Sequence, residues 1–158
     1  MEKRVAKAFG KKNYLIGKDN NGICYWLEEA SWDCDWYWGF GYVRTYTNNE
    51  YPEKSRDINC HCHFDKLFFK GNMMSKDMFD IFFVECVLDE KEKWKLLELM
   101  KTFYTMKDYS DLINRGGSHY TDNPVKEDIK NEDEYRRINE IVLPKIFEEI
   151  YKLLGGEK

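Results

Sequence analysis

The chain of 158 residues is long enough for one hydrophobic core and short for two, so we expect a single domain over residues 1–158. An apolar fraction of 42% and a charged fraction of 34% are those of a soluble globular protein, and no apolar run has the length of a membrane span. The net charge of −4, with both signs interleaved, gives neither a basic stripe for duplex nucleic acid nor an acidic mimic of a phosphate backbone.

Aromatic residues make up 16% of the chain, which is an unusually large share. Large rings bury much surface and can stabilise the core of a modest domain. They are also the side chains that most often stack on bases or anchor a partner. Composition alone does not choose between these uses.

The chain has five cysteines: Cys24, Cys34, Cys60, Cys62 and Cys86. An odd number, without a signal-peptide pattern at the N-terminus, favours the reducing cytosol of a host cell over a disulfide framework. We therefore expect a cytoplasmic protein. For Cys60 and Cys62 the simplest expectation is small, buried side chains.

The N-terminal segment carries the nearest thing to a basic cluster, formed by Lys3, Arg4, Lys7, Lys11 and Lys12. Charged residues at a chain terminus are most often solvated or frayed. We therefore expect residues 1–12 to form a solvated arm, and the sequence leaves open whether this arm is flexible.

The next segment predicts a small antiparallel sheet. Asn21-Gly22 lies between two runs rich in Ile, Leu, Tyr and Trp, a strong hairpin signal over residues 13–28. A second extended run, residues 36–47, alternates a row of rings on one face with a face that has glycines at positions 39 and 41. Glycines at alternate positions indicate that a packed helix or a ligand comes close to that face.

Helices are predicted after residue 75. Ser75 can cap a short helix over residues 76–87, and Asp89 with Glu92 resembles a capping box ahead of a helix over residues 90–108. The expected apolar face of this second helix consists of Trp94, Leu97, Met100, Phe103 and Tyr104.

A last helix is expected from about residue 131 to 154, with an acidic start at residues 132–134 and a stop at Gly155-Gly156. Pro144 should kink this helix or split it in two. Its expected apolar stripe is Tyr135, Ile138, Ile141, Val142, Ile146, Ile150 and Leu153.

Taken together, these elements predict an α+β fold. A small N-terminal antiparallel β-sheet, made of the hairpin and the aromatic strand, is packed by three to four C-terminal helices.

The densest group of metal-ligand side chains is His61-x-His63-x-Asp65. On an extended segment alternate residues share a face, so these side chains could converge on one ion, which zinc would suit best. His119 could supply a further ligand. The run resembles the His-x-His-x-Asp-His ligand motif of metallo-β-lactamase-fold hydrolases, but Lys66 stands at the last position, the downstream motifs are absent, and that fold is not carried over. The alternative is a pair of histidines hydrogen-bonded at a strand end.

A second group precedes and enters the ring-lined strand. Two carboxylates beside aromatic walls could perform acid-base chemistry or hold a nucleotide that stacks on an indole, with an arginine on its phosphate. The alternative is an aromatic core strand entered through a solvated turn. The candidate ligand-binding residues are Asp33, Asp35, Trp36, Trp38, Tyr42 and Arg44.

The stretches SWDCDWYWGFGYV, TNN and HCHFD, within residues 14–70, resemble parts of small uncharacterised proteins of phages and mobile elements in low-GC Gram-positive bacteria. The resemblance implies an anti-defence role of the anti-CRISPR or signal-sequestering kind. The leading hypothesis is a non-enzymatic protein that binds a defence effector or sequesters a nucleotide signal. The competing hypotheses are a small metal-dependent hydrolase acting on a phosphodiester through His61, His63 and Asp65, and a structural subunit, with a homodimer left open.

Overall fold

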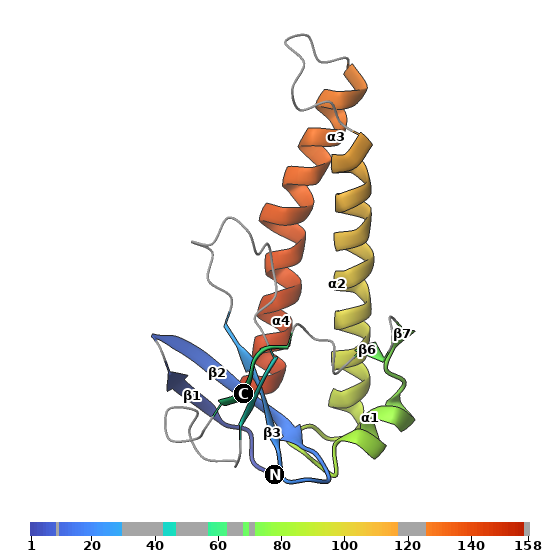
Figure 1. Ribbon diagram of the computed structural model, residues 1–158. Coiled ribbons are helices and arrows are strands. Elements are labelled where there is room, and N and C mark those ends of the chain that lie inside the picture. The colour runs from blue at the N-terminus through green and yellow to red at the C-terminus, as the bar shows by residue number, and fades with distance from the viewer. Residues whose placement is uncertain are drawn as a thin grey trace.

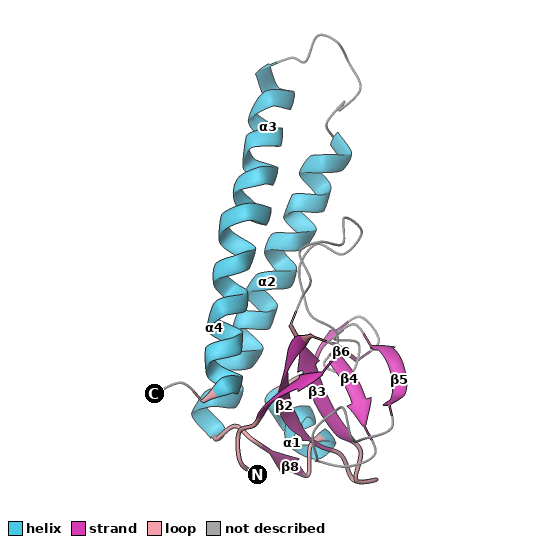
Figure 2. Cartoon of the chain, turned by 90° about the vertical axis from the view of Figure 1, so that its left-hand side faces the viewer, coloured by secondary structure: helices cyan, strands magenta, loops and turns pink. Residues whose placement is uncertain are grey.

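In the computed structural model, the described residues are 1–8, 10–29, 43–46, 57–62, 68–69, 72–116 and 126–156. A small curved β-sheet forms the base of the molecule, and two long antiparallel helical segments cross it and extend well beyond it (Figures 1 and 2). The strands come first and the long helices after, so the predicted α+β class is confirmed.

The main sheet is an antiparallel meander whose strands neighbour one another in chain order. Its strands are β1 (Val5–Ala8), β2 (Lys11–Lys18), β3 (Cys24–Glu28), β4 (Val43–Tyr46) and β5 (Asp57–Cys62). A short strand from later in the chain, β8 (Glu85–Cys86), pairs with the end of β2. Two further short strands, β6 (Phe68–Phe69) and β7 (Asn72–Met73), form a separate hairpin.

The predicted hairpin is present as β2 and β3. Its loop is held by Asp19, whose Oδ1 accepts hydrogen bonds from the backbone N–H groups of Asn21 (2.9 Å) and Ile23 (3.0 Å). Gly22 adopts a left-handed backbone with φ of 81°, a conformation that costs glycine little. The hydrogen-bond pattern is that of a three-residue loop followed by a bulge, so Asn21-Gly22 ends the loop and does not form a two-residue turn.

The second extended run is present as β4, which pairs with β3 on one side and β5 on the other. This strand covers residues 43–46 of the predicted 36–47. The remainder, with Gly39 and Gly41, lies outside the described residues.

The N-terminal arm needs a correction, because part of residues 1–12 belongs to the sheet. β1 pairs with β2 from Val5↔Tyr14 to Ala8↔Lys11. Ala6 is buried, and its burial gives this short strand an apolar anchor. The basic side chains around it are exposed or half-buried, in keeping with the solvated character predicted for them.

The two caps predicted for the first helices are confirmed. The hydroxyl of Ser75 accepts a hydrogen bond from the N–H of Met78 (3.2 Å) at the start of α1 (Lys76–Phe82). Asp89 and Glu92 form the reciprocal pair of a capping box, with distances of 2.9 and 3.2 Å, at the start of α2 (Glu90–Gly116). The first helix is shorter than predicted, because β8 takes residues 85–86 into the sheet.

The buried face of α2 differs from the prediction at its first residue. Trp94 is 56% exposed, and Leu96 takes its place in the core beside Leu97. Met100 and Phe103 are buried as predicted. A helical stripe wide enough to include Trp94 would extend beyond the area that the sheet and the second long helix cover.

The last helical segment is longer than predicted and runs without a break. It comprises α3 (Lys126–Arg137), the π-helical turn η2 (Ile138–Val142) and α4 (Leu143–Gly155). Pro144 neither splits nor ends it: the preceding turn widens, so that the N–H of Leu143 bonds to the carbonyl of Ile138. A π-turn is a known way to accommodate an irregularity within a helix.

The π-turn also shifts the phase of the apolar stripe. Because one turn holds an extra residue, Leu143 follows Ile138 in the buried row, and Ile141 is left 51% exposed. Ile146 and Ile150 are buried as predicted. The acidic residues 132–134 lie inside α3 and not in its first turn, so the predicted helix start is wrong. The predicted stop is confirmed by Gly156, a left-handed C-cap with φ of 68°.

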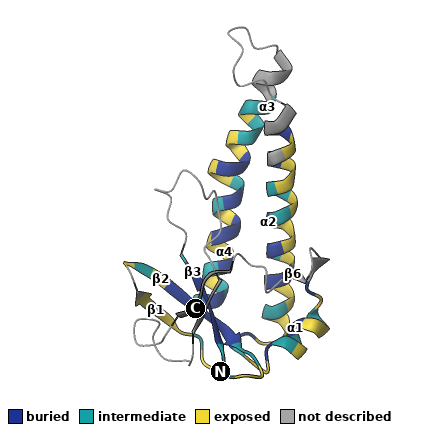
Figure 3. Ribbon diagram, viewed as in Figure 1, coloured by how far each residue is buried: buried dark blue, intermediate teal, exposed yellow. Residues whose placement is uncertain are grey.

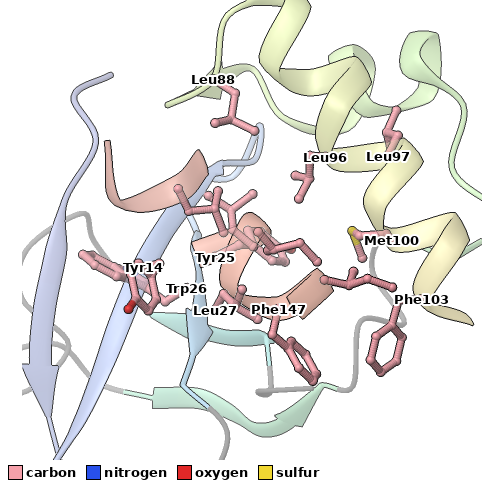
Figure 4. Packing of buried hydrophobic residues seen from close by; sticks show 14 of the residues in the cluster. Tyr14, Tyr25, Trp26, Leu27, Leu88, Leu96, Leu97, Met100, Phe103 and Phe147 are labelled. Atoms are coloured by element: carbon pink, nitrogen blue, oxygen red, sulfur yellow. The ribbon is translucent and has the colours of Figure 1, made fainter. Parts of the chain in front are cut away.

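The hydrophobic core lies where the sheet meets α4 and the N-terminal half of α2 (Figures 3 and 4). Burial continues up the facing sides of the long helices as a stripe, with exposed residues on their outer sides (Figure 3). Within that stripe, Asn139 donates hydrogen bonds to Ser110 Oγ (2.7 Å) and to the carbonyl of Tyr135 (2.8 Å). Partnered polar groups of this kind favour one alignment of the two helices.

Among the described glycines, Gly17 leaves the least room for a side chain. A Cβ added there would lie 2.5 Å from the carbonyl oxygen of Glu85 and 2.8 Å from the ring of Phe83. Gly17→Ala should therefore lower the free energy of unfolding by about 1–3 kcal/mol, as measured by urea denaturation, since backbone atoms must move. Gly155→Ala is the matched control, because its Cβ would make only ordinary contacts from 3.4 Å outward. Equal stability of the two variants would contradict this account of the β2–β8 contact.

Candidate functional site

An open groove of about 420 Å³ lies between the β2–β3 loop and α1. One wall is the loop, residues 19–21, and the other is formed by Met78, Ile81 and Phe82 of the helix. These three side chains share one face of α1 because they are three and four positions apart. The groove thus combines a polar turn with an apolar helix face.

Tyr25 connects the two walls of this α1 groove. Its hydroxyl donates to Asp19 Oδ2 (2.9 Å) in the loop. Its ring packs edge-on against Phe82 (5.1 Å between centroids) and Phe83 (5.3 Å). With Asp19 also holding the loop backbone, both walls are fixed before any partner arrives, which reduces the entropy lost on binding.

The solvent side of α1 and the residue after it carry large apolar side chains that are not packed into the core. Ile81 is 78% exposed and Val84, just beyond the helix, is 53% exposed, whereas Phe79 and Phe83 are buried on the opposite side. Single exposed apolar residues are common, but adjacent ones beside a groove are typical of interaction surfaces. Asp77 is exposed and lies one helical turn before Ile81, so it adds a negative charge beside that residue.

An ion-pair network fixes α1 to the start of α2. Lys76 contacts both Asp80 (2.5 Å) and Glu90, and Lys93 contacts Asp80 (2.6 Å) and Glu90 (3.2 Å). Hydrogen bonds from Lys76, and then from Lys93, lower the pKa of the Asp80 and Glu90 carboxyls. The same contacts raise the pKa of the two lysines. These shifts are explained by ion pairing between the helices.

The two cysteines whose side chains are described are unpaired thiols. Burial raises the pKa of Cys24 to about 11, and burial likewise raises the pKa of Cys86. Both are therefore protonated at neutral pH, the form that is a poor nucleophile and a poor metal ligand.

Most of the residues predicted for a site fall outside the described part of the chain. Arg44 lies in β4, directly opposite Trp26 of β3, and His61 lies in β5. Within the described ranges, no group of three or more His, Cys, Asp or Glu side chains is placed to hold a metal ion. The other predicted residues, which lie outside those ranges, are Asp33, Asp35, Trp36, Trp38, Tyr42, His63, Asp65 and His119.

The α1 groove was missed in the sequence, although one signal for it is present. Residues 78–84 hold six apolar side chains, more than one side of a two-turn helix can bury. An excess of this kind predicts exposed apolar surface. It does not reveal that the β2–β3 loop forms the other wall.

No protein-family model, no curated protein and no solved structure matches this chain. Among the helices in the described ranges, none is long and apolar enough to cross a membrane.

The lowered pKa values of Asp80 and Glu90 predict a pH dependence of stability. A carboxyl whose pKa is lower in the folded state adds stability above its unfolded pKa, about 4, and loses it as the pH falls through the folded value. Asp80→Asn should thus lower the melting temperature at neutral pH and flatten its fall on acidification, as followed by circular dichroism. An unchanged acid profile would contradict a stabilising role for the network. Asp108→Asn, at an exposed site in α2, is the control.

Proposed function

We propose that this protein is a non-enzymatic binding protein that inhibits a bacterial defence effector by occupying part of its surface. The observation that carries the proposal is the α1 groove, in which the exposed Met78 and Ile81 lie opposite a loop fixed by Asp19. The anti-defence context comes from the sequence resemblance.

The groove suits a protein partner. Burying a large aliphatic side chain such as that of Ile81 contributes about 1.5–3 kcal/mol, and a few such residues supply most of the energy of an interface. The exposed amides of Asn20 and Asn21 on the facing wall can provide polar contacts at the rim. Apolar centre and polar edge together describe a small recognition surface.

Inhibition by occupation has a distinct stoichiometry. A binding protein blocks its target in proportion to the amount of complex, whereas an enzyme would act at substoichiometric amounts. Phage plating on strains that each carry one defence system, with and without the protein, would identify the blocked effector. Titration of the purified effector would then distinguish binding from turnover.

Ile81→Glu should strongly weaken this inhibition. Placing a carboxylate in the apolar contact should cost about 2 kcal/mol or more, a thirtyfold or larger increase in Kd measured by calorimetry with the identified effector. The fold should be retained, because Ile81 lies largely in solvent.

Ile141→Glu is the matched control, because Ile141 is likewise an exposed isoleucine (51%) but lies on η2 in the helical hairpin. It should leave inhibition intact. Full inhibition by Ile81→Glu, or equal loss with both variants, would contradict the assignment of the α1 groove. If the wild-type protein protects phage against none of the defence systems, the anti-defence role itself is wrong.

A further inference from the structure

A second groove, separate from α1, lies between the β1–β2 hairpin and α4 and has a volume of about 460 Å³. We call it the β1–α4 groove. Its described lining consists of Val5, Lys12, Tyr14, Pro144, Phe147, Glu148, Tyr151, Lys152 and Gly155.

Two lysines face each other beside this groove in an unfavourable arrangement. Lys12 lines the groove, and Lys7 is its direct partner across the β1–β2 ladder. Both are exposed. Directly opposed residues of an antiparallel pair project from the same face, and like charges in that position destabilise the strands.

Neighbouring lysines in the same region have carboxylate partners. Lys11 contacts Glu28 (3.3 Å) and Lys152 contacts Glu148 (3.0 Å). Among the described residues, no carboxylate lies within ion-pair distance of the side chains of Lys7 or Lys12. The Glu29 carboxylate accepts a hydrogen bond from the backbone N–H of Lys12 (3.4 Å), but it makes no ion pair with the Lys12 side chain. Exposed like charges that no ion pair offsets are a local conflict of the kind that proteins show at functional surfaces.

The strand that carries Lys7 is also an edge of the described sheet, since β1 pairs with β2 alone. Its outer backbone groups can accept a further extended strand, the mode of peptide recognition by strand addition. Val5, 41% exposed, lies on β1 at the mouth of the groove and offers an apolar contact to such a strand.

The aromatic floor favours a peptide over a nucleotide. Tyr14 and Tyr151 stack on each other (4.8 Å between centroids, 16° between planes), and Phe147 lies parallel to Tyr151 at 6.0 Å. Tyr151 therefore already stacks with the rings of both Tyr14 and Phe147. A base would need an open ring face on which to stack. Apolar side chains need only the ring surfaces and edges that line the hollow.

From this charge complementarity and edge geometry we propose that the β1–α4 groove binds an extended acidic segment of a partner protein. The segment adds to the outer edge of β1. Its alternate apolar side chains enter the groove, and its carboxylates neutralise Lys7 and Lys12. This surface is independent of the α1 groove.

The test uses the full-length protein and a short fluorescent peptide in which Glu alternates with Val and Tyr. Anisotropy should show binding that weakens as salt is raised, and amides of β1 should exchange more slowly with solvent in the complex. Lys7→Gln/Lys12→Gln should weaken binding about tenfold, the effect of losing two exposed ion pairs. The same variant, without peptide, should melt at the same or a higher temperature, because the repulsion is removed.

Lys91→Gln/Lys101→Gln is the matched control, since it makes the same change in net charge at exposed positions of α2 and should bind the peptide as the wild type does. Equal binding by the two double variants would overturn the proposal, as would equal binding of a peptide with Lys in place of Glu. Binding of ATP at Lys7 and Lys12 with no binding of the acidic peptide would overturn it in favour of a small anion. Peptide binding that persists in Ile81→Glu would confirm that the two grooves are separate.

Discussion

The arrangement of the molecule depends on which strands pair with the two edges of β2. One edge pairs with β3 over residues 13–18, while the other is divided, with β1 along its first half and β8 at its end. The division is possible because Gly17 has no side chain where the backbone of residue 85 approaches. Through β8 the chain returns to the sheet after α1, which fixes α1 beside the β2–β3 loop and sets the starting point of α2.

Both candidate surfaces follow from that division. The α1 groove exists because β8 holds the short helix next to the loop, and the β1–α4 groove exists because β1 occupies the first half of the same edge. Their chemistry differs: the first has an apolar helix wall facing a loop with Asp19, and the second has an aromatic floor beside Lys12. A small protein with two such surfaces is suited to hold two parts of one partner, or two partners, at a defined separation.

The helical hairpin above the sheet is built around a second local irregularity. Pro144 cannot donate a backbone hydrogen bond, and the helix responds by widening into η2, which moves Leu143 into the buried row and Ile141 out of it. Nearby, the side-chain amide of Asn139 donates a hydrogen bond to the Ser110 hydroxyl, inside the contact between the helices. An apolar stripe alone permits the two helices to slide by a turn, and this polar pair favours one alignment.

The sequence by itself determined the features whose physics is local. The caps at Ser75 and Asp89, the loop at Gly22 and the stop at Gly156 each depend on a side chain or a backbone conformation within a few residues, and all are present. The order of strands and helices, and hence the α+β class, followed from hydrophobic periodicity of the same short range.

Tertiary structure decided everything that depends on a distant partner. The pairing of β1 and β8 with β2, the exposure of Trp94, and the α1 groove arise from contacts between segments many residues apart, which periodicity does not encode. Trp94 has the spacing of a core residue, yet its side of α2 meets neither the sheet nor α4. Spacing specifies which residues share a face, but only the packed fold determines which face is covered.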